Sequence, residues 1–208
     1  MISWAVVAHT DRLPYALDLA KTLDATLTVD DGTLGADANH LRAWTTAQST
    51  EHAWTAVVED DAVPVDDITT QAQKALAAAP EPVVSMYLGR GRPVRWQDRI
   101  SRTLATARTD PHWFTTTHVL HAVAVAIRTD LVEDWLDWAQ DKTRPIDERL
   151  TAWCMARGHR VAYAWPSLFD HQDGPSLIPA DKRYRPECPR TAWRTGTRDA
   201  WTSSAQPM

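Results

Sequence analysis

The sequence predicts a single α/β domain in which helices flank a mostly parallel sheet. Short runs of strand-forming residues alternate with segments of helical periodicity, an order that is typical of parallel sheets. A chain of 208 residues, 44% hydrophobic and 24% charged, fits one globular domain and excludes a coiled coil or a wholly disordered chain. The longest uncharged, mainly apolar stretch near the middle, residues 119–127, is too short for a bilayer, which needs roughly 20 residues.

The first part of the chain shows the alternation most clearly. A strand is expected over 3–9, and apolar residues at helical spacing predict a helix over 13–23. A second strand over 25–29 ends in an Asp-Asp-Gly turn, and a helix is expected from 39 to about 48. The continuous apolar run at 54–58 is typical of a parallel strand that is covered on both faces.

Later segments follow the same pattern less regularly. A helix is expected over 66–79, where Pro80 stops it, whereas the basic stretch 89–112 has too weak a periodicity to assign an element. After Pro179 the chain is rich in Pro, Arg and Trp, which predicts a tail that wraps the body or stays partly mobile. The other expected elements are strands at 82–88, 119–127 and 160–164 and helices at 129–140 and 148–157.

The net charge of −5 hides two basic segments. Residues 90–108 hold six arginines against one aspartate, and residues 182–198 hold six Lys or Arg against one glutamate, so each segment carries +5. Arginines interleaved with tryptophans can contact a phosphate backbone and stack on bases, or hold a nucleotide diphosphate. A solvated charge run is an equally open interpretation of each segment.

Carboxylates follow two of the expected strands, at the sheet edge where α/β proteins bind ligands. Asp30 and Asp31 end the second strand, and Glu59, Asp60 and Asp61 follow the third. Hard divalent cations prefer such oxygen ligands. Because side chains alternate along an extended chain, Glu59 and Asp61 should point to one side and Asp60 to the other. A solvated acidic turn is the alternative.

Five segments occur in the order found in one known family. Together they cover most of the chain from about residue 2 to 178, and they resemble nucleotide-sugar glycosyltransferases of the GT-A fold, in particular short phage and actinobacterial members. The matching segments are AWTAVVEDDAVP (53–64), SMYLGRGRPVRWQ (85–97), HAVAVAIR (121–128), RPIDERLTAW (144–153) and WPSLFDHQDGPSL (165–177).

The resemblance implies a GT-A-like domain over 1–178, with the Arg/Pro/Trp-rich tail, 179–208, packing on it. The Glu-Asp-Asp segment then corresponds to the family's D-x-D-type motif, which holds Mn²⁺ or Mg²⁺ on the two phosphates of the donor. By resemblance Asp61 is a metal ligand, His171 completes the metal site, and Glu59 contacts ribose or a metal-bound water. The family often has Asp where this chain has the longer Glu59.

The resemblance also implies roles for other side chains, with Asp147 as the base that deprotonates the acceptor hydroxyl and His121 near the donor sugar. Helix capping and a satisfied core histidine are the open alternatives for these two. Asp170 and Asp173 could orient His171. Residues expected near the donor nucleotide are His9, Arg12, Asp30, Asp31, His40, Arg42, Glu59 and Asp60. Residues expected to bind the acceptor or phosphate are Arg90, Arg92, Arg95 and Arg99.

These features predict a metal-dependent glycosyltransferase that uses a nucleotide-diphosphate sugar, with a UDP-sugar as the first choice. The leading acceptor is a 5-hydroxymethyl-pyrimidine in phage DNA, which the resemblance to phage glycosyltransferases and the two basic segments together suggest. Transfer to protein or to a surface glycan is one alternative. Another is a metal-dependent phosphodiesterase or nuclease using Asp30, Glu59, Asp61 and His171. A binding module with a spent active site is the third.

Two features favour the cytoplasm, which would be that of the host if a phage encodes the protein. The first seven residues lack a basic n-region and a small-residue cleavage site, so they are interpreted as part of a strand and not as a signal peptide. Cys154 and Cys188 are too few for a disulfide framework or a cysteine zinc site, which agrees with a reducing compartment.

Overall fold

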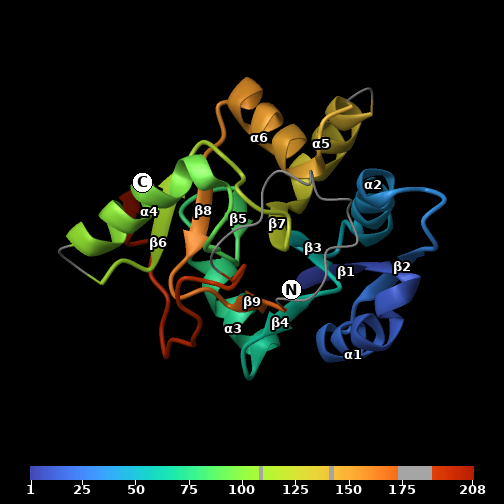
Figure 1. The fold of residues 1–208 in the computed structure, drawn as a ribbon, viewed down its shortest axis with the longest axis horizontal. Coiled ribbons are helices and arrows are strands. Elements are labelled where there is room, and N and C mark those ends of the chain that lie inside the picture. Colours follow the sequence, from blue (N-terminus) through green and yellow to red (C-terminus); the bar gives the residue numbers. More distant parts are fainter. Residues whose placement is uncertain (108–109, 141–142, 173–188) are drawn as a thin grey trace.

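A mixed sheet of eight strands runs through the centre of the protein (Figure 1). The computed structural model describes residues 1–107, 110–140, 143–172 and 189–208. In spatial order the strands are β10 (Ala205–Pro207), β6 (Trp113–Thr116), β8 (Val161–Ala164), β5 (Val83–Ser85), β7 (Ala124–Arg128), β3 (Trp54–Glu59), β1 (Ile2–His9) and β2 (Thr26–Asp30).

Parallel neighbours outnumber antiparallel ones in this sheet. The pairs β1–β2, β1–β3, β5–β8 and β6–β10 are parallel, whereas β3–β7, β5–β7 and β6–β8 are antiparallel. Strand β7 therefore runs against both of its neighbours and separates the parallel group β2–β1–β3 from the rest. The predicted fold class, a single α/β domain with a mostly parallel sheet flanked by helices, is confirmed.

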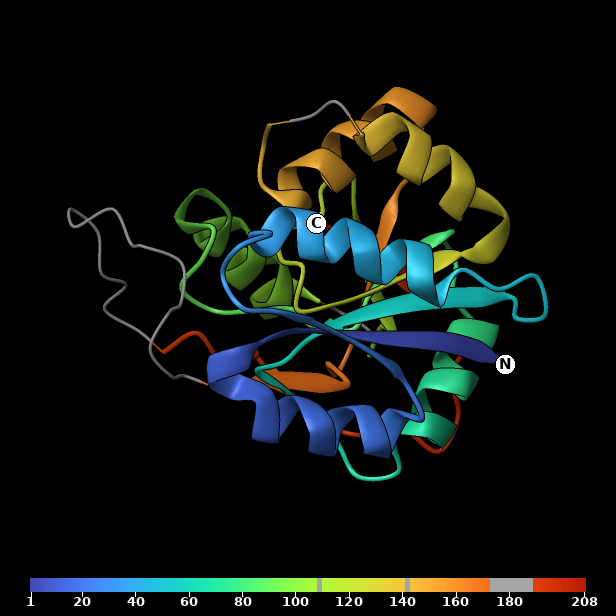
Figure 2. The same ribbon diagram turned by 90° about the vertical axis from the view of Figure 1, so that its right-hand side faces the viewer.

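Helices cover both faces of the sheet, as Figure 2 shows from the side. One face carries α1 (Leu13–Leu23) and α3 (Ile68–Ala77), with the short 3₁₀ turn η1 (Thr10–Arg12) leading into α1. The other face carries α2 (Ala36–Ala47), α4 (Val94–Thr106), α5 (Val132–Ala139) and α6 (Ile146–Arg157), with the 3₁₀ turn η2 (Thr129–Leu131) before α5.

The two helical layers explain why β1 is apolar at almost every position. Trp4, Val6 and Ala8 belong to the core cluster under α1 and α3, whereas Ala5 and Val7 belong to the cluster under α2, α5 and α6. A strand that is buried on both faces shows no alternation of apolar and polar residues. The continuous run Trp-Ala-Val-Val-Ala thus encodes the centre of a three-layer domain.

A second, two-stranded sheet lies at the carboxyl end of β3. Strand β4 (Ala62–Pro64) pairs antiparallel with β9 (Phe169–His171), and Ala62 lies opposite His171 in the register. The backbone N–H of Gln172 donates to the carbonyl oxygen of Asp61 at 2.8 Å. This small sheet brings the acidic turn after β3 next to His171, although more than 100 residues separate them in the sequence.

The described end of the chain, residues 189–208, packs against the sheet. Strand β10 pairs with β6, and Trp201 joins the core cluster under α1 and α3. The guanidinium of Arg198 donates to both carboxylate oxygens of Asp110, at 2.8 and 3.0 Å. The proposed boundary between residues 178 and 179 lies within 173–188, outside the described residues, and stays a prediction.

Several expected elements differ from the structure. The run 119–127 is strand only from Ala124, and 160–164 is not the last strand, because β9 and β10 follow it. The unassigned basic stretch contains α4. Only Trp96 and Ile100 are buried on this helix, and the exposed arginines around them obscure its apolar periodicity. Among the described residues no helix has the length and apolar character that crossing a membrane requires.

Candidate functional site

Two clefts meet at the carboxyl ends of the strands that surround the acidic turn. The first has a volume of about 420 Å³ and lies beside the ends of β1, β2 and β3. Its polar lining consists of His9, Arg12, Asp30, Asn39, His40, Glu59, Asp60, Asp61, His171 and Arg190. The second, of about 290 Å³, shares Glu59, His171 and Arg190 with the first. These shared residues form the wall between the clefts.

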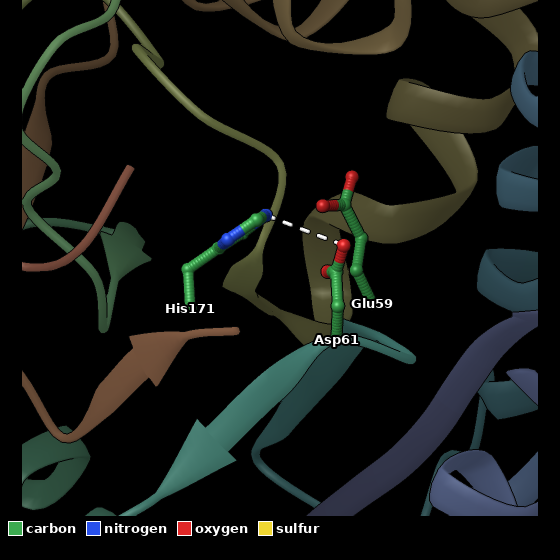
Figure 3. A group of neighbouring side chains, drawn as sticks. All are labelled: Glu59, Asp61 and His171. Atoms are coloured by element: carbon green, nitrogen blue, oxygen red, sulfur yellow. Dashed lines mark ion pairs between the residues drawn. The ribbon is translucent and has the colours of Figure 1, made fainter. Parts of the chain in front are cut away.

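Glu59 and His171 of that wall form a candidate metal centre with Asp61, which lines the first cleft only (Figure 3). One ligand atom of each lies within 4.8 Å of the others, so a single ion could contact all three. Two carboxylates and an imidazole suit Mn²⁺, which accepts nitrogen ligands more readily than Mg²⁺ does. One oxygen of Asp61, Oδ1, is buried and has no hydrogen-bond partner within the described part of the chain. Such an unpaired oxygen also fits a cation site.

Asp61 is held as a carboxylate by its contacts with Arg12 and His171. Its Oδ2 accepts from Arg12 Nη1 at 2.5 Å and lies 3.3 Å from Nε2 of His171. Burial by itself raises the pKa of Asp61, but the interactions with His171 and Arg12 outweigh it and hold the pKa below its usual value. Asp61 is therefore ionised and ready to bind a cation at neutral pH.

Asp60 turns away from the candidate metal centre, as the alternation along the chain implies. Its Oδ2 accepts from the backbone N–H of His9 at 2.9 Å, and its Oδ1 accepts from Arg12 Nη1 at 3.0 Å. Burial raises the pKa of Asp60 despite these two donors. Both of its oxygens thus serve to tie the end of β1 to the end of β3, although the residue still lines the first cleft.

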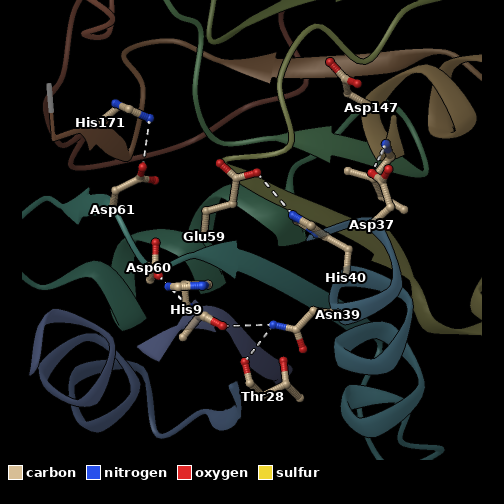
Figure 4. Close-up of polar contacts among 12 residues, drawn as sticks. His9, Thr28, Asp37, Asn39, His40, Glu59, Asp60, Asp61, Asp147 and His171 are labelled. Atoms are coloured by element: carbon tan, nitrogen blue, oxygen red, sulfur yellow. Dashed lines mark hydrogen bonds and ion pairs between the residues drawn. The ribbon is translucent and has the colours of Figure 1, made fainter. Parts of the chain in front are cut away.

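Helix α2 fixes the opposite wall of the first cleft (Figure 4). Nε2 of His40 lies 3.2 Å from Oε1 of Glu59. The buried Asn39 amide donates to the carbonyl oxygens of Ala8 at 3.0 Å and Thr28 at 3.2 Å, so it joins the ends of β1 and β2. Arg42 donates to Asn39 Oδ1 and to a strand carbonyl, and it is not part of the cleft lining.

The loop between β2 and α2 folds over Asp30. Its carboxylate accepts from the backbone N–H groups of Leu34 and Gly35, both at 2.9 Å, and these bonds lower the pKa of Asp30. Gly35 adopts a φ of +86°, a conformation that other residues rarely tolerate. Asp31 accepts from the backbone and hydroxyl of Thr33 and lies outside the lining of the first cleft.

The second cleft holds Asp147, in the first turn of α6. The helix begins at Ile146, two residues earlier than the sequence predicts. Asp147 Oδ1 accepts from the N–H of Glu148 at 2.9 Å, a contact at the helix start. Burial raises the pKa of Asp147 to about 6, and the nearby negative charge of Glu59 contributes to the rise. A carboxyl group with this pKa is suited to proton transfer near neutral pH.

His121 lines the same cleft in its neutral form. Its Nε2 lies 2.7 Å from the carbonyl oxygen of Arg92, which can only accept, so this nitrogen carries the proton. Burial lowers the pKa of His121 to about 4. Its ring meets the edge of Tyr87, with ring centres 4.9 Å apart, and burial raises the pKa of the Tyr87 hydroxyl above its usual value.

The structure separates the four arginines expected at the acceptor. Arg90 and Arg92 line the second cleft, whereas Arg95 and Arg99 lie on α4 and line neither cleft. Arg90 also lies over the ring of Trp193, with its guanidinium carbon 4.9 Å from the ring centre. Four of the Lys and Arg residues in the two basic segments fall outside the described residues, namely Arg108, Lys182, Arg183 and Arg185.

Asp170 does not orient the imidazole of His171. Its Oδ1 accepts from the backbone N–H groups of His171 and Ala192, at 2.8 and 2.7 Å. Because neighbours along β9 point to opposite faces, the Asp170 side chain cannot reach the ring from its own side of the strand. Nδ1 of His171 has no partner within the described ranges. Asp173, the other expected partner, lies outside them.

Sequence reasoning did not assign Tyr87 or Arg190 to the site and left Asn39 without a role. Arg190 lines both clefts from the far end of the chain, and its carbonyl oxygen accepts from the hydroxyl of Tyr87 at 2.9 Å. The structure shows why residue 89 is a glycine, because a Cβ at that position would lie 2.4 Å from the hydroxyl oxygen of Tyr87. No local pattern marks Arg190.

Comparisons with known proteins give little beyond this geometry. No protein-family model matches the chain, and no curated protein matches it. Among solved structures, A197 from STIV is 12% identical with a TM-score of 0.46, over 81% of this chain and 84% of that chain. A protein from Bacillus anthracis, provisionally assigned as a glucose-1-phosphate thymidylyltransferase and solved in complex with a sucrose, is 10% identical with a TM-score of 0.43, over 78% and 86%. At these values neither likeness bears on activity.

Proposed function

We propose that the protein is a metal-dependent glycosyltransferase that moves a sugar from a nucleotide-diphosphate sugar, first of all a UDP-sugar, to an acceptor hydroxyl. One observation carries the proposal: the cluster of Glu59, Asp61 and His171 stands between two clefts of different chemistry. A group-transfer enzyme needs such a divided site, since donor and acceptor must meet at one point.

The first cleft suits the nucleotide part of the donor. Asp61 and His171 would hold a divalent ion together with Glu59, and that ion would stabilise the negative charge of the departing diphosphate. Arg12 adds a positive charge to the same wall, and His40 keeps the Glu59 carboxylate in place. The loop closed by Asp30, with His9 nearby, borders the space left for the nucleoside.

The second cleft suits the acceptor. In a transfer with inversion, Asp147 takes the proton of the acceptor hydroxyl. The hydroxyl oxygen of the acceptor bonds to the anomeric carbon of the donor sugar while the bond from that carbon to the diphosphate oxygen breaks. With a pKa of about 6, Asp147 is mostly ionised at pH 7 and can act as this base. His121, neutral and fixed by Arg92, offers a polar edge to the sugar without adding charge.

We further propose DNA carrying a 5-hydroxymethyl-pyrimidine as the acceptor. Arg95, Arg99 and Arg102 are spaced four and three residues apart on α4, so they share one exposed helix face, and Arg90 and Arg92 continue the positive charge to the second cleft. A row of arginines beside a cleft can follow a phosphate backbone.

Salt-dependent binding to duplex DNA tests the acceptor. The triple variant Arg92→Ala, Arg95→Ala, Arg99→Ala should bind more weakly and lose roughly one unit of salt slope for each phosphate contact removed. A matched triple variant, Lys21→Ala, Lys74→Ala, Arg128→Ala, removes the same charge from exposed positions elsewhere and should bind normally. Equal binding by both variants would reject DNA and favour a protein or glycan acceptor.

Thermal stability with nucleoside diphosphates tests the donor site. A ligand that binds only the folded protein raises its melting temperature, so UDP with Mn²⁺ should stabilise the wild type and not Asp61→Asn. Asp66→Asn changes an exposed aspartate five residues away and should respond like the wild type. Absence of a shift with every nucleotide, together with metal-dependent phosphodiester hydrolysis, would replace the transferase by the nuclease alternative.

A further inference from the structure

A single guanidinium joins the two aspartates of the acidic turn. Arg12 comes from η1, between β1 and α1, and its Nη1 lies 3.0 Å from Oδ1 of Asp60 and 2.5 Å from Oδ2 of Asp61. The side chain of Arg12 is 17% exposed, and those of the two aspartates are 8% and 10% exposed. Ion pairs between side chains that are so little exposed are screened only weakly by salt.

The two aspartates differ in what else they bind. Asp60 has a donor on each oxygen, because the N–H of His9 occupies the one that Arg12 does not. Asp61 shares a single oxygen between Arg12 and His171, while its other oxygen is buried without a partner among the described residues. Asp60 is therefore an anchor for Arg12, whereas the oxygen of Asp61 that faces His171 is the one that Arg12 already holds.

Arg12 and a divalent ion would compete for Asp61. The ion would sit between Asp61, Glu59 and His171, and the oxygen that faces His171 is the one that Arg12 holds. A positive charge within a few ångströms of a second one also repels it by an amount that matters in a partly buried site. The guanidinium thus both occupies a ligand atom and opposes the charge of the ion.

We propose that Arg12 is a competing internal cation that weakens divalent-ion binding in the resting protein. Without the ion, Arg12 neutralises Asp61; when the ion binds, Arg12 is displaced from Asp61 and stays paired with Asp60. This inference rests on the metal site of the proposed function. It assigns Arg12, a positioning residue, the task of keeping the ion weakly bound until a further negatively charged ligand enters the first cleft, which Arg12 also lines.

Titration calorimetry with Mn²⁺ alone, at fixed pH and without nucleotide, tests the competition. Arg12→Gln keeps a hydrogen-bonding group and removes the charge, so it should bind Mn²⁺ about tenfold more tightly than the wild type, a change of about 1.4 kcal/mol. Arg157→Gln removes the same charge from a pair with Asp134 on α5 and α6 and should bind like the wild type. Unchanged or weaker binding by Arg12→Gln would overturn the proposal.

A second variant separates the effect of the Arg12 charge from the effect of its contact with the Asp61 oxygen, and it keeps the test valid if Arg12→Gln does not fold. Arg12→Gln leaves two buried carboxylates without their counter-charge, whereas the double variant Arg12→Gln, Asp60→Asn removes one of them and leaves the net charge of the site unchanged. If Arg12 occupies a ligand atom, the double variant should still bind Mn²⁺ several-fold more tightly. Wild-type affinity in a folded double variant would contradict displacement of Arg12 from Asp61.

Melting temperatures give an independent readout that does not depend on turnover. Mn²⁺ should raise the melting temperature of Arg12→Gln more than that of the wild type, because the ion replaces the missing positive charge. Binding of Mn²⁺ without any binding of nucleotides would reject the proposed function and leave the competition intact. Failure of every variant to bind Mn²⁺ would overturn the competition, while nucleotide binding in its absence would still support a donor site.

Discussion

The first and second clefts share a wall but shift the pKa values of their carboxyl groups in opposite directions. In the first cleft, Asp61 is paired with Arg12 and His171, and its pKa lies below the usual value. In the second, burial disfavours the charged forms, since it raises the pKa of Asp147 to about 6 and lowers that of His121 to about 4. The partners available to each carboxyl group, rather than the residue type, therefore decide whether its pKa falls or rises.

The second cleft makes stability depend on pH in two opposing ways. The contribution of Asp147 is fully present below its unfolded pKa of about 3.8 and is lost as pH rises through about 6. His121 acts in the opposite direction, because its contribution is present above 6.5 and is lost as pH falls toward 4. The two effects overlap between about pH 4 and 6 and partly cancel there.

Removal of the Asp61 charge should have the largest effect on the proposed sugar transfer. Asp61→Asn takes the charge from the first cleft only, and transfer should fall by at least about 10³-fold, since several kcal/mol of charge stabilisation are lost. Radiolabelled sugar transfer measured with and without Mn²⁺ checks this. Activity that stays metal-dependent in the variant would place the ion elsewhere.

Asp147→Asn should have the next largest effect and should change the pH dependence. Transfer should fall by about 10²-fold or more, and the rise of rate through pH 6 should disappear. The melting temperature of the variant should increase relative to the wild type as pH rises from 4 to 7.5, because the ionisation penalty at Asp147 is gone. Asp137→Asn, an exposed change on α5, should show no such trend.

Asn39→Ala should lower the free energy of unfolding, because it removes hydrogen bonds beside the first cleft without changing the charge there. Two buried carbonyl oxygens, of Ala8 and Thr28, lose their donor, which costs about 2 kcal/mol and several degrees of melting temperature. Urea unfolding measures the loss. Thr46→Ala, an exposed change on the same helix, should cost much less. Equal costs would mean that the amide does not hold the strand ends together.

The smallest expected effect is the absence of a change at His121. Since its pKa is about 4, its ring proton resonances should not shift between pH 7.5 and 5.5, although histidines of the unfolded chain titrate near 6.5. Two-dimensional NMR with labelled histidine checks this. The His121 signals are identified as those that are missing from the spectrum of His121→Gln. A midpoint near 6.5 would remove the proposed contrast between the clefts at this residue.

The parts of the fold that sequence could predict are those in which local pattern and tertiary environment agree. Residues 13–23 form a helix with the predicted bounds because their buried side chains recur every three or four positions. Helix α4 was missed because only Trp96 and Ile100 are buried among its many arginines. Strand β10 could not be predicted, since three weakly apolar residues become a strand only by pairing with β6.

Site residues that directly follow a predicted strand could be identified from the sequence. Site residues that distant segments bring together could not. Glu59 and Asp61 were identified from their place after an apolar run, and His171 only from the resemblance to a family. Alternation along the chain separated Asp60 from Glu59 and Asp61, but no sequence pattern indicated that Arg12 would lie between two aspartates. Such pairings depend on how β1 and β3 lie side by side, which no local pattern encodes.

The pairing of β4 with β9 sets the order in which the site can appear during synthesis. Ala62 lies opposite His171, so the three side chains of the candidate metal centre come together only after the ribosome has released the chain beyond residue 171. Until then, nascent Glu59 and Asp61 lack their imidazole partner, however well β1, β2 and β3 have already folded. A chain truncated before β9 would therefore keep the acidic turn and lack the complete candidate metal centre, so the assembly of this cluster marks that translation has passed this point.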